Sequence, residues 1–323
     1  MIHDLIIIGS GAAGLSAAIY AGRYRMNVLV VGGEFGGESA TGGKFYNYPG
    51  TGPIDGYDLM KKMKEQAESV GVKFVDGKVT EIKREGHCFS VSVVEGSRSE
   101  EFGARTVILA NGTVRRRLGL PREKELANKG VHYCVTCDGP VYVDKVVAMV
   151  GGGDAAVKGV NLLGQYAKKI YVLVRGDGIK AEPINQEEMK KLGNKVEILF
   201  NTEVRELVGD DKLEKLILSK PHNGSSELSV GGLFVEIGAM PDTTLAKSLG
   251  VSTDERGYIL VDNGMKTNID GVFAAGDNVN FFGSFKQAIT AAAMGSVAAT
   301  SAYQDNKVHG ELCSIHWVPS KLG

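Results

Sequence analysis

The sequence is poor in the residues that mark several classes of protein. It contains four cysteines and one tryptophan in 323 residues. Four cysteines are too few for the disulfide framework of a small secreted domain, so a close pair among them points to redox chemistry or metal binding. The formal net charge of -1 gives no general attraction to nucleic acid or to an anionic membrane. We therefore expect neither nucleic acid nor membrane as a partner.

Long apolar runs and a basic leader are also missing. The apolar runs stay far below the roughly 18–20 residues that span a bilayer. The first residues, Met1 to Asp4, carry no basic stretch ahead of an apolar one. We expect a cytoplasmic protein, long enough for two domains.

Glycine, by contrast, is abundant, with 44 residues, and two stretches arrange it as a nucleotide fingerprint. The first reads G-S-G-A-A-G from Gly9 to Gly14, between an apolar run and a small-residue helix. Such glycines form a tight turn, let the backbone approach a pyrophosphate and let the helix pack on the strand. Glu34 follows about 20 residues later, where an acid can hold a ribose hydroxyl.

The second fingerprint reads G-G-G-D-A-A from Gly151 to Ala156, again after an apolar strand. Its last residue, alanine, still permits close packing of helix on strand. The first nucleotide domain is thus interrupted by a second one and then resumes. We predict an α/β fold with two Rossmann-like nucleotide-binding domains, each in three ββα layers, with residues 115–241 inserted between 1–114 and 242–323. The basic stretch from Arg115 to Arg122 reads as a solvated linker.

Between the two fingerprints lies Cys134-Val135-Thr136-Cys137-Asp138. Two thiols at this spacing can close a disulfide and carry two electrons, and the thiolate of such a pair is a nucleophile. Asp138 can give or take a proton. The alternative is a structural zinc site, for which Cys313 and His316 could supply the other two ligands.

Together these motifs resemble the low-molecular-weight thioredoxin reductases over nearly the whole chain. The resemblance rests on the two fingerprints, the cysteine motif and four further stretches: Gly36-Gly37, Asn47 to Gly50, Gly276-Asp277 and Lys286 to Thr290. It implies an FAD-dependent disulfide oxidoreductase, a homodimer, a thioredoxin-like partner and a rotation of the inserted domain between two states. It also implies that Cys137 faces the flavin and that Cys134 attacks the substrate disulfide.

The resemblance also implies the ligand contacts. The residues for FAD are Gly9, Gly11, Ala12, Ala13, Gly14, Gly33, Glu34, Gly37, Glu38, Asn47, Val79, Gly112, Gly276, Asp277, Lys286, Gln287 and Ala288. The residues for a pyridine nucleotide are Gly151, Gly153, Asp154, Ala155, Ala156, Arg175 and Lys180.

The second nucleotide site departs from the family pattern. In the family, several arginines after the second strand of this site grip the 2′-phosphate of NADPH, and here Arg175 is followed by Gly176, with Lys180 further on. This leaves NADPH, NADH or a protein donor such as ferredoxin as possible electron sources. A redox sensor without turnover is a further alternative. Two interpretations are open for the tail with His316 and Trp317: packing at the surface or in a dimer, or a cover over a flavin.

Overall fold

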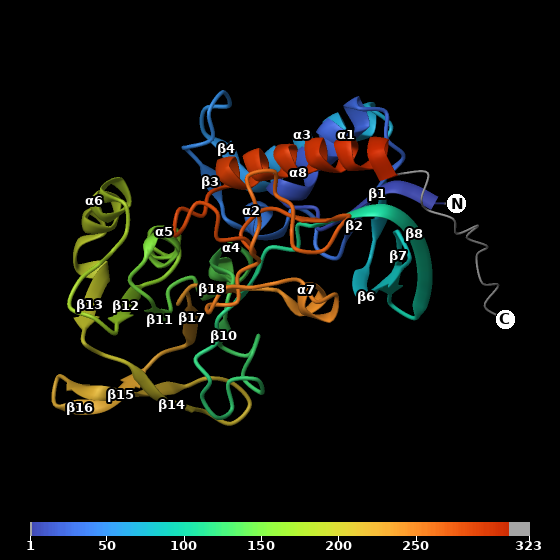
Figure 1. Cartoon of the computed structure of the whole chain (residues 1–323). Coiled ribbons are helices and arrows are strands. Elements are labelled where there is room, and N and C mark those ends of the chain that lie inside the picture. Colours follow the sequence, from blue (N-terminus) through green and yellow to red (C-terminus); the bar gives the residue numbers. More distant parts are fainter. Residues whose placement is uncertain (1, 310–323) are drawn as a thin grey trace. The chain divides into compact units, whose positions relative to one another are not determined.

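The computed structural model describes residues 2–309, which divide into two compact units (Figure 1). Unit 1 consists of Met1–Val114 and Met240–Gly323, and unit 2 of Arg115–Ala239. The chain passes between them along β9 (Thr113–Arg115) and β18 (Ala239–Pro241), and these two strands pair with each other. Mixed α/β units built on parallel sheets confirm the fold class predicted from the fingerprints.

Unit 1 is built on a parallel sheet. Its strands are β1 (Ile2–Ile8), β2 (Val28–Gly32), β5 (Lys73–Asp76), the second half of β8 (Arg98–Leu109) and β19 (Val272–Ala274). β1 lies between β2 and β8, and its residues Leu5 to Ile8 are all buried. A continuous apolar run of this kind is typical of a parallel strand covered on both faces.

The first half of β8 belongs to a second layer. It pairs antiparallel with β7 (Cys88–Glu95), which pairs antiparallel with β6 (Lys78–Glu85). Because β8 is 12 residues long, it contributes to the parallel sheet and to this meander. The smaller elements of unit 1 are α2 (Gly37–Thr41), β3 (Lys44–Phe45), β4 (Ile54–Asp55) and α7 (Thr244–Ser248).

Three helices form the third layer: α1 (Ala12–Arg23), α3 (Gly56–Ser69) and α8 (Ala288–His309). Helix α8 lies alongside α1 (Figure 1). Small residues permit this approach, since a Cβ on Gly295 would lie 2.0 Å from the carbonyl oxygen of Ala13. The helix over the first fingerprint is therefore held by close backbone packing on α8 as well as on its own sheet.

Unit 2 repeats the arrangement. Its five-stranded parallel sheet has the order β10 (Val131–His132), β17 (Gly232–Val235), β11 (Val146–Val150), β12 (Lys169–Val174) and β13 (Val196–Phe200). Alternate residues of β11 face two different cores: Val147 and Met149 pack with the helices, whereas Ala148 and Val150 pack with the antiparallel strands. The remaining elements are α4 (Val135–Asp138), η1 (Gly139–Tyr142), α5 (Asp154–Leu163), α6 (Pro183–Lys191), η2 (Gly193–Lys195), β14 (Val204–Val208), β15 (Lys215–His222) and β16 (Ser225–Ser229).

One expectation about the linker is wrong. Arg116 and Arg117 are exposed, as a solvated stretch requires, but Arg115 is paired with Glu236 at 3.2 Å and its side chain is only 23% exposed. The carboxylate at the end of β17 explains the difference, because it offers the guanidinium a charged partner within unit 2. Across residues 2–309, no helix is long and apolar enough to cross a membrane.

Candidate functional site

Unit 1 carries a cleft at the carboxyl ends of its parallel strands. This edge is where open α/β sheets bind ligands. The wall includes the first fingerprint, the turn after β2 and the start of α8. The residues that line the cleft are Ile8, Gly9, Ser10, Gly11, Ala12, Ala13, Val31, Gly33, Glu34, Gly36, Gly37, Glu38, Ser39, Gly77, Lys78, Val79, Ala110, Asn111, Gly112, Thr113, Asp242, Leu245, Gly276, Asp277, Gln287, Ala288 and Ala291.

The glycines of the first fingerprint are needed for distinct steric reasons. Gly9 has a φ of +111°, and a Cβ there would lie 2.3 Å from the carbonyl oxygen of Ala110. A Cβ on Gly14 would lie 1.9 Å from the carbonyl oxygen of Gly9. Gly11 is freer, since the nearest atom to its Cβ would be the carbonyl oxygen of Gly36 at 3.7 Å. Gly9 and Gly14 thus close the strand–turn–helix unit, while Gly11 keeps the backbone open to the cleft.

Asp277 projects from the end of β19 into this cleft. Its Oδ1 is buried and has no hydrogen-bond partner among the described residues. Burial raises the pKa of Asp277, the positive charge of Lys286 opposes this, and Glu38 adds to it. Lys286 itself donates to the carbonyl oxygen of Val279 and lies 4.5 Å from the centre of the Tyr258 ring. A buried acceptor without a donor is costly in the protein alone, which indicates that a ligand supplies the donor.

Most of the residues expected to bind FAD line this one cleft, and three do not. Gly14 packs against Gly9 within the turn, Asn47 donates to Oε1 of Gln287 at 3.1 Å, and Lys286 donates to the carbonyl oxygen of Val279. The sequence reasoning missed Asn111 and Asp242, which also line the cleft. The amide of Asn111 donates to the carbonyl oxygen of Asp242 at 2.8 Å. The Asn111-Gly112 turn was visible in the sequence, but its partner Asp242 lies 131 residues away and carries no motif.

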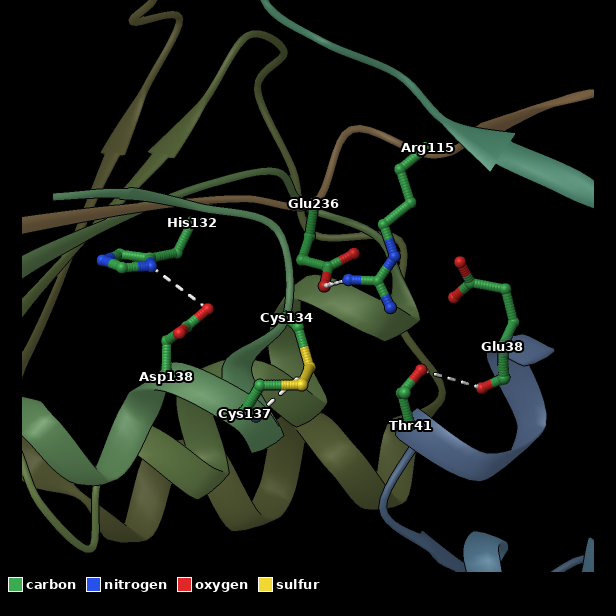
Figure 2. The surroundings of a disulfide bond; sticks show 8 residues. All are labelled: Glu38, Thr41, Arg115, His132, Cys134, Cys137, Asp138 and Glu236. Atoms are coloured by element: carbon green, nitrogen blue, oxygen red, sulfur yellow. Dashed lines mark hydrogen bonds and ion pairs between the residues drawn. A yellow bond between two sulfur atoms is a disulfide. The ribbon is translucent and has the colours of Figure 1, made fainter. Parts of the chain in front are cut away.

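In unit 2, Cys134 and Cys137 form a disulfide with a Cα–Cα distance of 5.3 Å (Figure 2). Cys134 is the N-cap residue of α4, and its sulfur accepts a hydrogen bond from the backbone N–H of Cys137 at 3.2 Å. Asp138 ends the same short helix, with 31% of its side chain exposed. The helical turn therefore carries both sulfurs and the carboxylate on one rigid segment.

A histidine that the sequence reasoning missed lies beside this segment. Nδ1 of His132 is 3.1 Å from Oδ2 of Asp138, and its Nε2 is 2.6 Å from the hydroxyl oxygen of Tyr142 (Figure 2 shows the first contact). The imidazole side chain is only 5% exposed. The only hint in the sequence was that His132 lies two residues before Cys134. A histidine in a short strand gives no reason to expect a contact with Asp138.

The second fingerprint forms the expected turn, but its acid is already engaged. Gly151 has a φ of +139°, and a Cβ there would lie 2.2 Å from the carbonyl oxygen of Glu236. Asp154 pairs with Lys158 at 2.8 Å and accepts hydrogen bonds from the side chain of Asn185 and the backbone of Glu182. Although burial opposes it, these contacts lower the pKa of Asp154. Its carboxylate ties α5 to the start of α6.

The segment expected to hold a nucleotide phosphate folds back on the second turn. The backbone N–H of Lys180 donates to the carbonyl oxygen of Gly152 at 2.7 Å, and that of Asn201 donates to Gly176 at 2.8 Å. Arg175 and Lys180 are both exposed. Gly153 faces open space, since a Cβ there would meet no atom within 4 Å. Two cations and an open turn are therefore present, without the cluster of arginines that the family pattern contains.

The zinc alternative gains no support from the described residues. The sulfurs of Cys134 and Cys137 are bonded to each other. Within residues 2–309, no cluster of three or more His, Cys, Asp or Glu side chains is arranged to hold a metal ion. Cys313, His316 and Trp317 lie outside the described residues, so the predicted flavin cover stays a prediction.

Comparisons with known proteins agree with this geometry. Residues 3–295 match the family model for pyridine nucleotide-disulphide oxidoreductases. The chain is 37% identical over 315 residues to a thioredoxin reductase of Peptoclostridium acidaminophilum, covering 93% of this chain and 96% of the relative. Its structure matches thioredoxin reductase of Lactococcus lactis with a TM-score of 0.87 and 34% identity, over 94% of this chain and 98% of that one.

A further solved structure shares less of the geometry. A ferredoxin-flavin thioredoxin reductase from Clostridium acetobutylicum matches with a TM-score of 0.51 and 32% identity, over 95% of this chain and 99% of that one. The matched family model, the level of identity and the redox disulfide lead to the same conclusion. The chain belongs to the pyridine nucleotide-disulphide oxidoreductase family, and within it to the FAD-dependent thioredoxin reductases.

Proposed function

We propose that this chain is a thioredoxin-disulfide reductase in which unit 1 binds FAD and unit 2 carries the redox pair and the nucleotide-type fold. The Cys134–Cys137 disulfide would accept two electrons from the flavin, and the resulting dithiol would reduce a thioredoxin-like protein. One observation carries the proposal: the C-x-x-C pair is closed as a disulfide and followed by an acid, in a chain with a glycine-lined dinucleotide cleft.

The cleft of unit 1 fits FAD. When bound and reduced, FAD would supply the two electrons that reduce the disulfide. The turn from Gly9 to Gly14 offers backbone N–H groups to the pyrophosphate, and Glu34 is placed to accept from a ribose hydroxyl. Asp277 provides an acceptor whose Oδ1 has no partner among the described residues. The fit rests on this acceptor and on the open glycine turn.

The dithiol chemistry follows from the cysteine pair. Two electrons and two protons break the Cys134–Cys137 bond and leave two thiols. Asp138 follows Cys137 directly and exchanges one of those protons. The thiolate of Cys134 then attacks the disulfide of the substrate protein and forms a mixed disulfide, releasing one substrate thiolate. Attack by Cys137 on the sulfur of Cys134 releases the second substrate thiolate and restores the disulfide.

The electron donor is a second question within the same function. The turn at Gly151 and Gly153 suits a pyridine nucleotide, with Arg175 and Lys180 as the cations nearest in sequence to its strand end. Two features favour a second candidate, in which a one-electron protein donor such as ferredoxin replaces NADPH or NADH. Asp154 is already paired with Lys158, and Arg175 is the single arginine after the second strand of this site. The match to a ferredoxin-flavin thioredoxin reductase supports keeping that candidate.

An anaerobic donor comparison tests the proposal. The purified flavoprotein is mixed with NADPH, NADH or reduced ferredoxin, and flavin bleaching is followed together with reduction of a thioredoxin disulfide. Bleaching by a nucleotide with reduction of thioredoxin supports the first candidate, and bleaching only by ferredoxin supports the second. Bleaching by any donor without transfer to thioredoxins contradicts the reductase function and indicates a redox sensor.

We also propose that the protein works as a homodimer, as the resemblance implies. Light scattering of the purified protein at micromolar concentration measures the mass directly. A particle of twice the 34.4 kDa chain is expected. A monomer at all concentrations contradicts the proposed assembly without affecting the dithiol chemistry.

A further inference from the structure

The feature that the reductase chemistry leaves unexplained is the buried His132. It ends β10 and pairs in register with Phe234 of β17. Its ring stacks on the Phe234 ring, with centroids 5.3 Å apart and planes at 28°. A histidine this deeply buried needs partners for both ring nitrogens, because an unpaired polar atom in an apolar setting is costly.

Its first partner, Tyr142, is held in a defined place. The tyrosine hydroxyl lies 2.6 Å from Nε2 of His132, and the two rings meet edge to face at 5.3 Å. The Tyr142 ring rests over Gly232, where a Cβ would come within 2.5 Å of it. The absence of a side chain at Gly232 thus makes room for the ring that reaches His132.

Its second partner is the acid of the redox motif. Nδ1 of His132 lies 3.1 Å from Oδ2 of Asp138, at contact distance but without the alignment of a formed hydrogen bond. Among the elements that pack against α4, the other titratable side chains are Tyr142 in η1 and, on α5, Asp154 and Lys158, which pair with each other. Within residues 2–309, the His132 ring thus connects Asp138 to a second polar group, the hydroxyl of Tyr142.

The protonation states of this trio follow from burial. Burial lowers the pKa of His132, although the charge of Asp138 opposes the shift. Burial also raises the pKa of Tyr142 to about 12, with a further contribution from Asp138. Near pH 7 the ring and the phenol are thus both neutral. With the phenol O–H as the hydrogen-bond donor to Nε2, the single ring proton sits on Nδ1, facing Asp138.

We propose that His132, oriented by Tyr142, is a positioning residue for Asp138 that directs Nδ1–H at the carboxylate and holds it in place for proton exchange with the dithiol. The inference rests on the proposed dithiol chemistry and deepens it. When the disulfide takes up two electrons, its two sulfurs need two protons. Asp138 passes its proton to one sulfur and becomes a carboxylate, solvent supplies the proton for the other sulfur, and Asp138 then regains a proton from solvent. His132 keeps its own proton throughout.

The test measures the reactivity of the dithiol and needs neither donor nor thioredoxin. The holoprotein is reduced with dithiothreitol under nitrogen, and alkylation of Cys134 and Cys137 by iodoacetamide is followed against pH by peptide mass. The alkylation rate plotted against pH should show several rises, here called limbs. The limb that is absent in Asp138→Asn is the one that depends on Asp138. In His132→Phe, which keeps a stacking ring, that limb should move up by about one pH unit, because the variant no longer points an N–H group at the carboxylate.

Two further variants separate positioning from packing. Tyr142→Phe removes only the hydroxyl that orients the ring, and it should move the same limb upward by a smaller amount. His3→Phe replaces another buried histidine, in unit 1, and should leave the profile unchanged. A limb that stays in place in Tyr142→Phe, and in His132→Phe where that variant folds, overturns the proposal, as does an Asp138→Asn profile identical to that of the unmodified protein.

The tautomer provides an independent readout if His132→Phe does not fold. Nitrogen-15 NMR of the imidazole in the unmodified holoprotein should show the proton on Nδ1 near pH 7. A proton on Nε2 overturns the proposal, because Nδ1 would then present a lone pair to the carboxylate. Failure of the donor comparison would leave both readouts intact, so a wrong reductase assignment and a wrong role for His132 can be told apart.

Discussion

Replacing Asp277 by asparagine should change flavin affinity and the stability of the apoprotein in opposite directions. Oδ1 of Asp277 is buried in the cleft without a partner among the described residues, so bound FAD is expected to supply the donor. A hydrogen bond to a charged group contributes about 1.5–3 kcal/mol. Asp277→Asn should therefore weaken FAD binding by about tenfold to a hundredfold, at about 1.4 kcal/mol per factor of ten.

The effect on the apoprotein follows from the sign of the pKa shift. Burial raises the pKa of Asp277 above its ordinary value, with Lys286 opposing the shift. A raised pKa means that the ionised side chain of Asp277 destabilises the fold. The contribution of Asp277 to the free energy of unfolding is therefore most favourable at low pH and is lost as pH rises through the folded-state pKa. At pH 7 the Asp277→Asn apoprotein should unfold at a higher temperature than the unmodified apoprotein, and the difference should narrow at pH 5.

Both quantities are measurable on the same preparations. Flavin is removed, FAD is titrated back by fluorescence quenching, and thermal unfolding of the apoprotein is recorded at pH 7 and pH 5. Glu65→Gln, which replaces an exposed acid on α3, is the matched control and should change neither quantity. An Asp277→Asn protein that binds FAD normally, or whose apoprotein is less stable at pH 7, refutes the assignment of this carboxylate to the flavin.

Three further outcomes are expected. Gly14→Ala should give a protein that does not retain flavin, because the new Cβ would lie 1.9 Å from the carbonyl oxygen of Gly9. Gly153→Ala should fold with flavin bound, since its Cβ meets no atom within 4 Å. Absorbance at the flavin band checks both variants. Cys137→Ser should keep flavin, lose turnover and trap a mixed disulfide with thioredoxin through Cys134, whereas Cys134→Ser should trap none. Arg175→Ala should weaken any NADPH binding by about tenfold or more and leave NADH binding unchanged, as isothermal titration can show.

The sequence was sufficient for the fold class and for the place of the redox pair. A strand, a glycine turn and a helix form one local unit, so both fingerprints could be read without knowledge of distant contacts. The apolar run from Leu5 to Ile8 marked a buried parallel strand in the same way.

The parts that could not be predicted depend on long-range contacts. Asp242 meets Asn111 across 131 residues, and His132 meets Tyr142 because the end of β10 and the turn after α4 are both fixed by β17. Arg115 looked like a surface charge until Glu236, 121 residues away, supplied its partner. Periodicity and local motifs carry no information about pairs of this kind.

The central claim is that the Cys134–Cys137 disulfide accepts electrons from the bound flavin. An anaerobic titration with dithionite, followed at the flavin absorbance, tests it most directly. The account predicts about four electrons per chain for the unmodified protein, two for the flavin and two for the disulfide, and about two for Cys137→Ser. A titration that ends at about two electrons in both proteins would contradict the claim.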